Sequence, residues 1–309
     1  MTMAWIMPLA AIAVAFCAFL AAMGFKGRVT TVGIDLGTTF SVVGLVQNGK
    51  VVIVSDKGRQ IFPSVVSYLD NGEIAVGYEA AARLSTDPRN TIYNAKRFMG
   101  RSMEEGDVRA YASAHPFKVV ERVNASALSQ VGFGIRATGH PPIVSPEEVG
   151  THVLKYLLKL TANYLGHSQV NKAVIAVPAK FSAVQRQATA AAYKAAGLKV
   201  MRVMEEPTAA AVAYRLHKRT DIHHILVYDF GGGTLDVSLL YVAKGSVEVY
   251  ATDGDEMLGG SDIDLCLFQI LTDRIRAEGG QVTKVKDADD VTDADDVTDV
   301  TDVTDVTDV

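Results

Sequence analysis

The fold is decided by Val32-Gly33-Ile34-Asp35-Leu36-Gly37-Thr38-Thr39-Phe40-Ser41, a run of β-forming residues that turns through glycine and threonine into another apolar run. The same pattern returns in Leu226-Val227-Tyr228-Asp229-Phe230-Gly231-Gly232-Gly233-Thr234-Leu235-Asp236. Each turn brings a carboxylate, backbone amides and hydroxyl groups to one point. Converging amides bind phosphate oxygens, and Mg²⁺ takes oxygen ligands such as carboxylates and water. Two such loops that face each other can therefore hold a nucleotide triphosphate from both sides.

A single Asp-x-Gly turn has a simpler interpretation, because such turns are common in ordinary hairpins. Here the whole arrangement is repeated: a strand, the turn, a second strand, and then a third strand at Val51–Val54 or Val247–Thr252. This internal repeat predicts two similar α/β lobes with a nucleotide cleft between them. Folds of that layout place their ligands at the carboxyl ends of strands, where both loops lie.

Length and composition set broad limits on the function. The 309 residues suffice for one large or two medium domains, and a hydrophobic share of 49% supports a packed core. The formal charge of −5 belongs to residues 287–309, which hold ten Asp and no Lys or Arg. Without them, 30 basic residues face 25 acidic ones. This modest excess forms no dense basic stripe with aromatic residues, so nucleic acid is not expected as a partner.

Secondary-structure signals change character along the chain. Short β-rich runs follow Thr30, with a tight turn at Asn48-Gly49, and they predict an antiparallel meander. From Ser145-Pro146-Glu147-Glu148, a capping box, apolar residues recur at intervals of three and four until Gly166 ends the helix. A strand at 173–177, a helix capped by Ser182 and Gln185, a strand at 198–204, an alanine-rich helix from 206 and a strand at 225–228 follow. This alternation predicts a largely parallel sheet with helices on its faces.

Both ends of the chain differ from this globular pattern. Residues 1–25 are predicted to be a signal or anchor segment, because residues 3–25 are uncharged, apolar and long enough to cross a bilayer. Lys26 and Arg28 favour a cytosolic body by the positive-inside rule, whereas the glycosylation sequon at Asn124 would matter only in a lumen. The Asp-Val-Thr repeats of residues 287–309 are too acidic and too repetitive to bury a core, so they predict a disordered acidic tail. A calcium-binding loop is the alternative, but the repeats lack the Gly and Glu that such a loop needs.

Several motifs occur in a fixed order between these ends. They are Gly33-Ile34-Asp35-Leu36-Gly37-Thr38-Thr39, Asn94-Ala95-Lys96-Arg97-Phe98-Met99-Gly100, Val177-Pro178-Ala179 with Gln185-Arg186-Gln187-Ala188-Thr189, Glu206-Pro207-Thr208-Ala209-Ala210-Ala211, and Asp229 to Ser238. Together they resemble the ATPase domain of the stress-70 (70-kDa heat-shock) chaperone family, within the actin and sugar-kinase superfamily. The resemblance covers roughly residues 32–277. It implies an α/β, actin-like (ribonuclease H-like) fold with lobes at 32–218 and 219–280, the second lobe being incomplete.

The resemblance also implies a role for each matching residue, with ATP and Mg²⁺ as the ligands. Asp35 and Asp229 would hold water around the metal. Lys96 would neutralise charge on the γ-phosphate and position the attacking water, which is chiefly electrostatic work. Glu206 would order water near the metal or act as the base. Contacts to the phosphates are assigned to Gly37, Thr38, Thr39, Phe40, Gly231, Gly232, Gly233 and Thr234, of which Thr234 also counts as catalytic; Pro178 and Arg186 are assigned to coupling the nucleotide state to the rest of the chaperone.

Some of these residues have simpler interpretations or depart from the family pattern. Taken alone, Lys96 is a solvated lysine beside Arg97, and Glu206 is a charge favoured by the dipole at a helix N-terminus. Glu205 stands where Asn is usual and places a second negative charge next to Glu206. Phe40 stands where Tyr is common, which removes a hydroxyl group near the cleft.

Within the family, the apolar leader, Pro116-Phe117-Lys118-Val119 and Tyr164-Leu165-Gly166 resemble a microsomal branch that lacks the peptide-binding domain. This resemblance implies a location in the lumen of the endoplasmic reticulum or microsomes, and it outweighs the charge argument above. It also implies an ATPase that serves protein folding or quality control. The expected partners are ATP or ADP and, among proteins, co-chaperones or ubiquitin-like and quality-control proteins. Membrane contact is expected only through residues 3–25.

The sequence contains no adenosine motif of the Gly-Gly-Ser-Thr-Arg type, no interdomain linker and no peptide-binding domain. We therefore expect weak ATP affinity and marginal stability. The alternative function is a catalytically impaired nucleotide-binding or interaction module. A small-molecule kinase of the same superfamily has less support, because no motif marks a sugar site.

Overall fold

The computed structural model describes residues 28–123, 129–243 and 245–279. The predicted N-terminal segment, the sequon at Asn124 and the acidic tail lie outside these residues. None of the described helices is both long and apolar enough to span a bilayer. The described residues fall into two compact units, which divide after Asp262.

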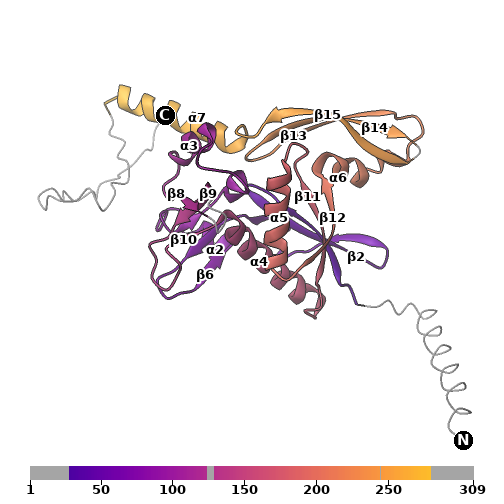
Figure 1. Ribbon diagram of the computed structural model, residues 1–309, viewed down its shortest axis with the longest axis horizontal. Helices are drawn as coiled ribbons and strands as arrows, with labels where there is room; N and C mark the ends of the chain where they lie inside the picture. The colour runs from indigo at the N-terminus through magenta and orange to yellow at the C-terminus, as the bar shows by residue number, and fades with distance from the viewer. Residues whose placement is uncertain (1–27, 124–128, 244, 280–309) are drawn as a thin grey trace, which may run out of the picture. The chain divides into compact units, whose positions relative to one another are not determined.

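A six-stranded mixed sheet lies at the centre of the first unit (Figure 1). Its order is β12-β11-β1-β2-β3, and β4 pairs with β2. The strands are β1 (Thr31–Leu36), β2 (Phe40–Gln47), β3 (Lys50–Ile53), β4 (Phe62–Pro63), β11 (Lys172–Val177) and β12 (Lys199–Glu205). β1, β11 and β12 are parallel, whereas β2 pairs antiparallel with β1, β3 and β4. Because β1 has neighbours on both sides, the end that carries Asp35 is firmly placed.

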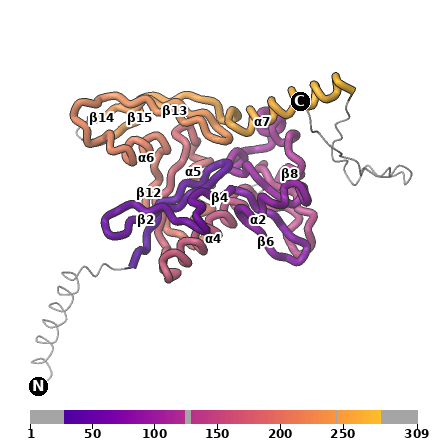
Figure 2. Tube along the Cα trace, turned by 180° about the vertical axis from the view of Figure 1, so that it is seen from behind, coloured from indigo at the N-terminus to yellow at the C-terminus, as the bar shows by residue number. Residues whose placement is uncertain are grey.

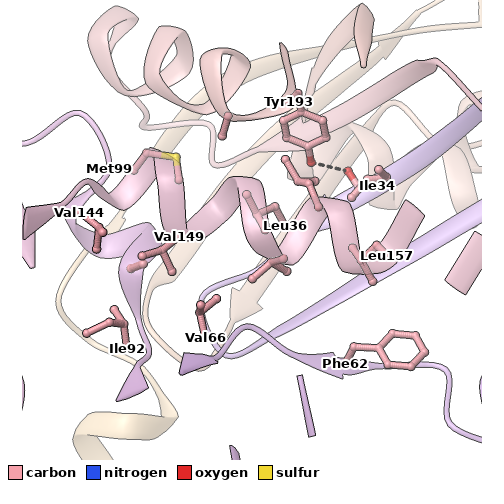
Figure 3. Close-up of a cluster of buried hydrophobic side chains, with 14 of the residues drawn as sticks. Ile34, Leu36, Phe62, Val66, Ile92, Met99, Val144, Val149, Leu157 and Tyr193 are labelled. Carbon is pink, nitrogen blue, oxygen red and sulfur yellow. Dashed lines mark hydrogen bonds between the residues drawn. The ribbon is translucent and has the colours of Figure 1, made fainter. Parts of the chain in front are cut away.

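The helices α4 (Pro146–Leu165) and α5 (Ala183–Ala195) pack together and against this sheet. Side chains of β1 alternate, so that Val32, Ile34 and Leu36 are buried on one face while the intervening residues are exposed on the other. Figure 3 shows Ile34 and Leu36 in the same apolar cluster as Leu157 of α4, with the hydroxyl of Tyr193 from α5 donating to the Ile34 carbonyl at 3.3 Å. This cluster is the main core of the protein.

The start and end signals of these helices are as predicted. The Ser145 hydroxyl accepts from the Glu148 amide at 3.1 Å, and the Glu148 carboxylate accepts from the Ser145 amide at 2.6 Å. The equivalent pair at Ser182 and Gln185 caps α5. Gly166 ends α4 at φ 70°, a left-handed conformation that glycine adopts without a steric penalty.

Two small antiparallel sheets extend the first unit. One has the order β10-β9-β8 and the other β6-β5-β7. Their strands are β5 (Val66–Tyr68), β6 (Ile74–Val76), β7 (Thr91–Ile92), β8 (Lys118–Val123), β9 (Ser129–Gly134) and β10 (Ile143–Val144), and the short helices α2 (Tyr78–Ala81), η1 (Ala95–Phe98) and α3 (Gly106–Ala112) lie between them in the chain. The 3-10 helix η1 matters most for the site, because it carries Lys96.

A third antiparallel sheet contains β13 (His224–Phe230), β14 (Leu235–Ala243) and β15 (Ser246–Asp255). The helix α6 (Glu206–Ala213) and the turn η2 (Leu216–Lys218) precede it, and α7 (Gly260–Ala277) follows it. Figures 1 and 2 both show α6 beside this sheet, in agreement with its contacts to all three strands. Leu226, Tyr228 and Phe230 leave one side of β13 open, with 67, 65 and 41% of their surface exposed.

The largely parallel sheet predicted from the sequence is found only in part. The prediction holds for β1, β11 and β12, but β13 does not join them. It pairs instead with β14, from Phe230 opposite Leu235 to His224 opposite Tyr241. The reason is local, because the glycine loop between these strands is short enough to act as a hairpin turn, and hairpin neighbours pair antiparallel.

Candidate nucleotide site

A pocket of about 520 Å³ lies where the two glycine loops meet. This volume is within the range typical of small-molecule and cofactor sites. The pocket is lined by Asp35, Gly37, Thr38, Thr39, Phe40, Lys96, Ala176, Glu206, Ala209, Ala210, Ala213, Asp229, Gly231, Gly232, Gly233 and Thr234. The structure therefore brings together every residue assigned from the sequence to catalysis, metal or phosphate.

The first glycine loop, residues 37–39, is the turn of the β1–β2 hairpin. Ser64 holds it from behind: its hydroxyl donates to the Gly37 carbonyl at 2.8 Å, and its amide donates to the Thr39 carbonyl at 2.8 Å. A Cβ atom at Gly37 would overlap the carbonyl oxygen of Phe40, so the turn requires glycine. This loop is thus both an ordinary hairpin turn and a wall of the pocket.

The second glycine loop, residues 231–234, is the turn of the β13–β14 hairpin, closed by the Gly231 amide donating to the Thr234 carbonyl at 2.9 Å. It lies directly against the first loop. A Cβ atom at Gly232 would overlap the Thr39 side chain, and one at Gly233 would overlap Thr38. The predicted facing of the two loops is therefore present, and it depends on glycine at both positions.

The hydroxyl oxygen of Thr39 is buried and has no hydrogen-bond partner among the described residues. A buried hydroxyl without a partner loses free energy relative to one that is hydrogen-bonded. Because Thr39 lies between the loops and lines the pocket, a phosphate oxygen would satisfy it. The amides, hydroxyls and missing Cβ atoms of both loops fit a polyphosphate in the same way.

Lys96 and Glu206 form an ion pair inside the pocket, with Nζ and Oε1 2.8 Å apart. Their side chains are only 10 and 17% exposed. Burial by itself lowers the pKa of Lys96, but Glu206, Asp35 and Asp229 outweigh it, so that the pKa is raised and the lysine stays charged. The simpler interpretation of Lys96 as a solvated lysine does not describe this arrangement, whereas Glu206 is the first residue of α6 as well as the partner of Lys96.

Asp35 and Asp229 are each the next-to-last residue of the strand that leads into a loop. Asp35 faces the pocket, yet protein surrounds it on its other sides. Burial raises the pKa of both carboxyl groups, and the negative charge of Glu206 adds to the effect, while Lys96 opposes it. Such a concentration of negative charge favours a bound cation. Two carboxylates with water suit Mg²⁺, which keeps much of its hydration shell.

The residues assigned to coupling lie outside the pocket. Arg186 donates from Nε to the Phe181 carbonyl at 2.9 Å and from Nη2 to the Ala179 carbonyl at 2.9 Å, which holds the loop after Pro178. Its Nη2 also donates to the Glu205 carboxylate at 3.0 Å. Glu205, which stands where the family usually has Asn, therefore pairs with Arg186, and the neighbouring Glu206 pairs with Lys96.

Some lining residues could not be named from the sequence. Ala176, Ala209, Ala210 and Ala213 leave space for a ligand rather than contacting it through polar atoms. The alanine-rich start of α6 was the available signal, since small residues on one helix face allow a close approach. Arg97, beside Lys96, contacts the second loop from behind, as described below.

The model of the Hsp70 protein family matches residues 31–291. This range includes both glycine loops, Lys96 and Glu206, and it spans most of the chain. Members of the family have an actin-like nucleotide-binding domain, which agrees with the mixed α/β structure and confirms the predicted fold class. Such domains bind ATP with Mg²⁺ and form the nucleotide-binding core of a chaperone. The chain belongs to the Hsp70 family.

Proposed function

We propose that this chain binds Mg²⁺·ATP between its two glycine loops and hydrolyses it. The observation that carries the proposal is the Lys96–Glu206 ion pair, which sits in the pocket that both loops line. A lone phosphate-binding loop would support binding only. The addition of a charged lysine and a carboxylate at the same point supports transfer of the γ-phosphoryl group to water.

Each polar group has a separate task in this proposal. The loop amides and the Thr39 hydroxyl hold the phosphates, while Asp35 and Asp229 hold water around the metal. The metal, when bound, neutralises phosphate charge. Lys96 places positive charge where the transition state is most negative, and Glu206 orders the attacking water and accepts its proton. Stabilisation of this kind by a fixed charge is the main means of catalysis in phosphoryl transfer.

The test is release of inorganic phosphate from Mg²⁺·ATP by the full chain and by Lys96→Ala. We expect the substitution to reduce the rate about 100-fold or more, the order of loss seen when one preorganised donor is removed. Lys159→Ala, an exposed lysine on α4, is the matched control and should keep the wild-type rate. Equal background rates in the wild type and Lys96→Ala would exclude an active enzyme.

A second candidate is a non-catalytic nucleotide-binding or interaction module. It is favoured by the open side of β13, where Leu226, Tyr228 and Phe230 are exposed. Phosphate release distinguishes the two functions. A non-catalytic module would bind Mg²⁺·ATP, but the wild-type chain would release phosphate no faster than the Lys96→Ala variant.

We also propose that the chain belongs to the microsomal ATPase-core branch of the family and works in protein folding or quality control inside the endoplasmic reticulum. Residues 3–25 would supply the signal or anchor, and Asn124 the glycan. Co-chaperones and ubiquitin-like or quality-control proteins are the proposed partners. Expression of the full chain with and without Asn124→Gln tests the location. A mobility shift on peptide:N-glycosidase treatment that requires Asn124 supports a lumenal body, and its absence contradicts it.

A further inference from the structure

Arg97 is a buried arginine beside the proposed catalytic lysine, and its own task is not explained by the site described above. Its side chain has 0% of its surface exposed. The guanidinium lies over the Tyr111 ring, 4.4 Å from its centre. All three nitrogens donate hydrogen bonds: Nε to the Gly233 carbonyl at 2.7 Å, and Nη1 and Nη2 to the two carboxylate oxygens of Asp262 at 3.2 and 2.5 Å.

The Gly233 carbonyl is one of three consecutive carbonyls of the second loop that are held from the same region. The Gly260 amide donates to the Gly231 carbonyl at 3.0 Å, and the Ser261 amide donates to the Gly232 carbonyl at 2.9 Å. Asp262 belongs to this arrangement too, because its carboxylate accepts from the Gly259 amide at 2.7 Å. Arg97 thus provides the third hydrogen bond of the series and fixes the segment that provides the other two.

Holding a carbonyl also sets the direction of an amide. The peptide unit is planar, and its C=O and N–H groups point in opposite directions. Fixing the carbonyls of Gly231, Gly232 and Gly233 therefore fixes the amides of Gly232, Gly233 and Thr234 on the opposite side of the loop. Gly232, Gly233 and Thr234 line the pocket.

We infer that Arg97 is a positioning residue for the polyphosphate: through Gly233 and Asp262 it holds the second glycine loop so that its amides face the ligand. The inference rests on the proposed binding of Mg²⁺·ATP in this pocket. Arginine suits the task better than lysine, because its planar fork reaches a carbonyl and both oxygens of a carboxylate at once. A lysine at this position would offer one point charge and could not make all three bonds.

Arg101 provides a matched control from the same stretch of chain. Its side chain is 10% exposed and donates to Glu105, Asp107 and Glu256 at 2.7, 2.6 and 3.0 Å. Like Arg97, it is a largely buried guanidinium with several carboxylate contacts. Unlike Arg97, it makes none of the hydrogen bonds to the loop carbonyls described above.

The experiment compares the full chain with Arg97→Gln, Arg97→Lys, Asp262→Asn and Arg101→Gln. We expect Arg97→Gln to weaken Mg²⁺·ATP binding about 10-fold or more by calorimetry, with Arg97→Lys and Asp262→Asn intermediate and Arg101→Gln within about twofold of the wild type. Unfolding temperatures of Arg97→Gln and Arg101→Gln should be similar, which separates positioning from general stability. Equal binding by Arg97→Gln and the wild type, or equal losses in Arg97→Gln and Arg101→Gln, would overturn the inference.

A second readout does not depend on nucleotide. Hydrogen exchange of the Gly260 and Ser261 amides reports whether the loop is held, since both donate to it. We expect faster exchange in Arg97→Gln than in Arg101→Gln, and unchanged exchange would overturn the inference. If the wild type does not bind Mg²⁺·ATP, the proposed function fails, and exchange alone decides the role of Arg97. If Arg97→Gln does not fold, Asp262→Asn must show the faster exchange.

Discussion

The two glycine loops have nearly the same sequence pattern but different structural support. The first leaves β1, a strand with neighbours on both sides, and Ser64 holds its carbonyls. The second leaves β13, an edge strand with Leu226, Tyr228 and Phe230 exposed. Its carbonyls are held by two other segments of the chain. Arg97 lies far before the loop in the sequence, and the start of α7 follows it.

This difference indicates that only the first loop is built into the main core. The second loop is held by polar contacts from other segments of the chain, namely Arg97 and the start of α7. Regions with few buried apolar contacts open at a lower free energy than core strands. The pocket therefore combines one firmly held loop with one that is held less firmly, and the following substitutions test how far that contrast extends.

The largest effect is expected for Leu157→Ala, in the core behind the first loop. Leu157 is fully buried in the cluster that contains Ile34 and Leu36 (Figure 3). Its truncation should lower the free energy of unfolding by about 3 kcal/mol, through lost burial and a cavity. The matched substitution Leu226→Ala on exposed β13 should cost less than about 0.5 kcal/mol. Urea unfolding measures both, and equal costs would contradict the contrast.

How much of the fold and of the site could be predicted from the sequence depends on how far apart the interacting residues are in the chain. The loops, the caps at Ser145 and Ser182, and the motif around Lys96 are local patterns, so they could be predicted. Ser64 and Gly37 are 27 residues apart, and Arg97 and Asp262 are 165 apart. Contacts over such separations are set by tertiary packing, and no periodicity or spacing marks them. The antiparallel pairing of β13 was missed for a different reason: the alternation of strands and helices was extended to β13, although the short glycine loop after it is itself a local hairpin signal.

The second effect concerns pH and the surroundings of Arg97, which supports the second loop and lies over the Tyr111 ring. His115 lies among Phe98, Tyr111 and Phe117, with ring centres 4.6 to 5.7 Å away. Burial lowers its pKa from 6.5 to about 4. The folded protein therefore keeps His115 neutral, while the unfolded chain takes up a proton below pH 6.5. Stability is fully present above pH 6.5 and is lost as the pH falls towards 4.

This loss should amount to about 2 to 3 kcal/mol, allowing for partial exposure of the ring. His115→Phe should remove it, so that unfolding free energies at pH 7 and pH 4.5 differ less than in the wild type. His224→Phe, an exposed histidine on β13, is the control and should keep the acid sensitivity. An unchanged pH profile in His115→Phe would show that the acid loss arises elsewhere.

A smaller effect separates the two loops directly. A Cβ atom at Gly37 would meet the backbone of Phe40 within the same turn, whereas one at Gly232 would meet the hydroxyl oxygen and the Cβ atom of Thr39, an overlap that is relieved if the second loop moves away from the first. Gly37→Ala should therefore cost about 2 kcal/mol of stability, as overpacking against a fixed group does. Gly232→Ala should cost about 1 kcal/mol or less while still weakening Mg²⁺·ATP binding. Denaturation and calorimetry on both variants test this. A larger stability loss in Gly232→Ala than in Gly37→Ala would show that the second loop, not the first, is the more firmly held of the two.

The smallest effect is expected for Ser64→Ala, which removes the support of the first loop without adding bulk. Only the side-chain part of that support is lost: the substitution deletes the hydrogen bond to the Gly37 carbonyl and leaves the buried Ser41 hydroxyl without its 2.8 Å partner. The backbone bond from residue 64 to Thr39 remains, so the loss should be about 1 kcal/mol. Ser113→Ala, whose exposed hydroxyl donates to the Ala110 carbonyl, should cost less than about 0.5 kcal/mol. Because the core still holds β1, Mg²⁺·ATP binding should weaken less in Ser64→Ala than in Arg97→Gln. The reverse order would show that the first loop is the less firmly held of the two.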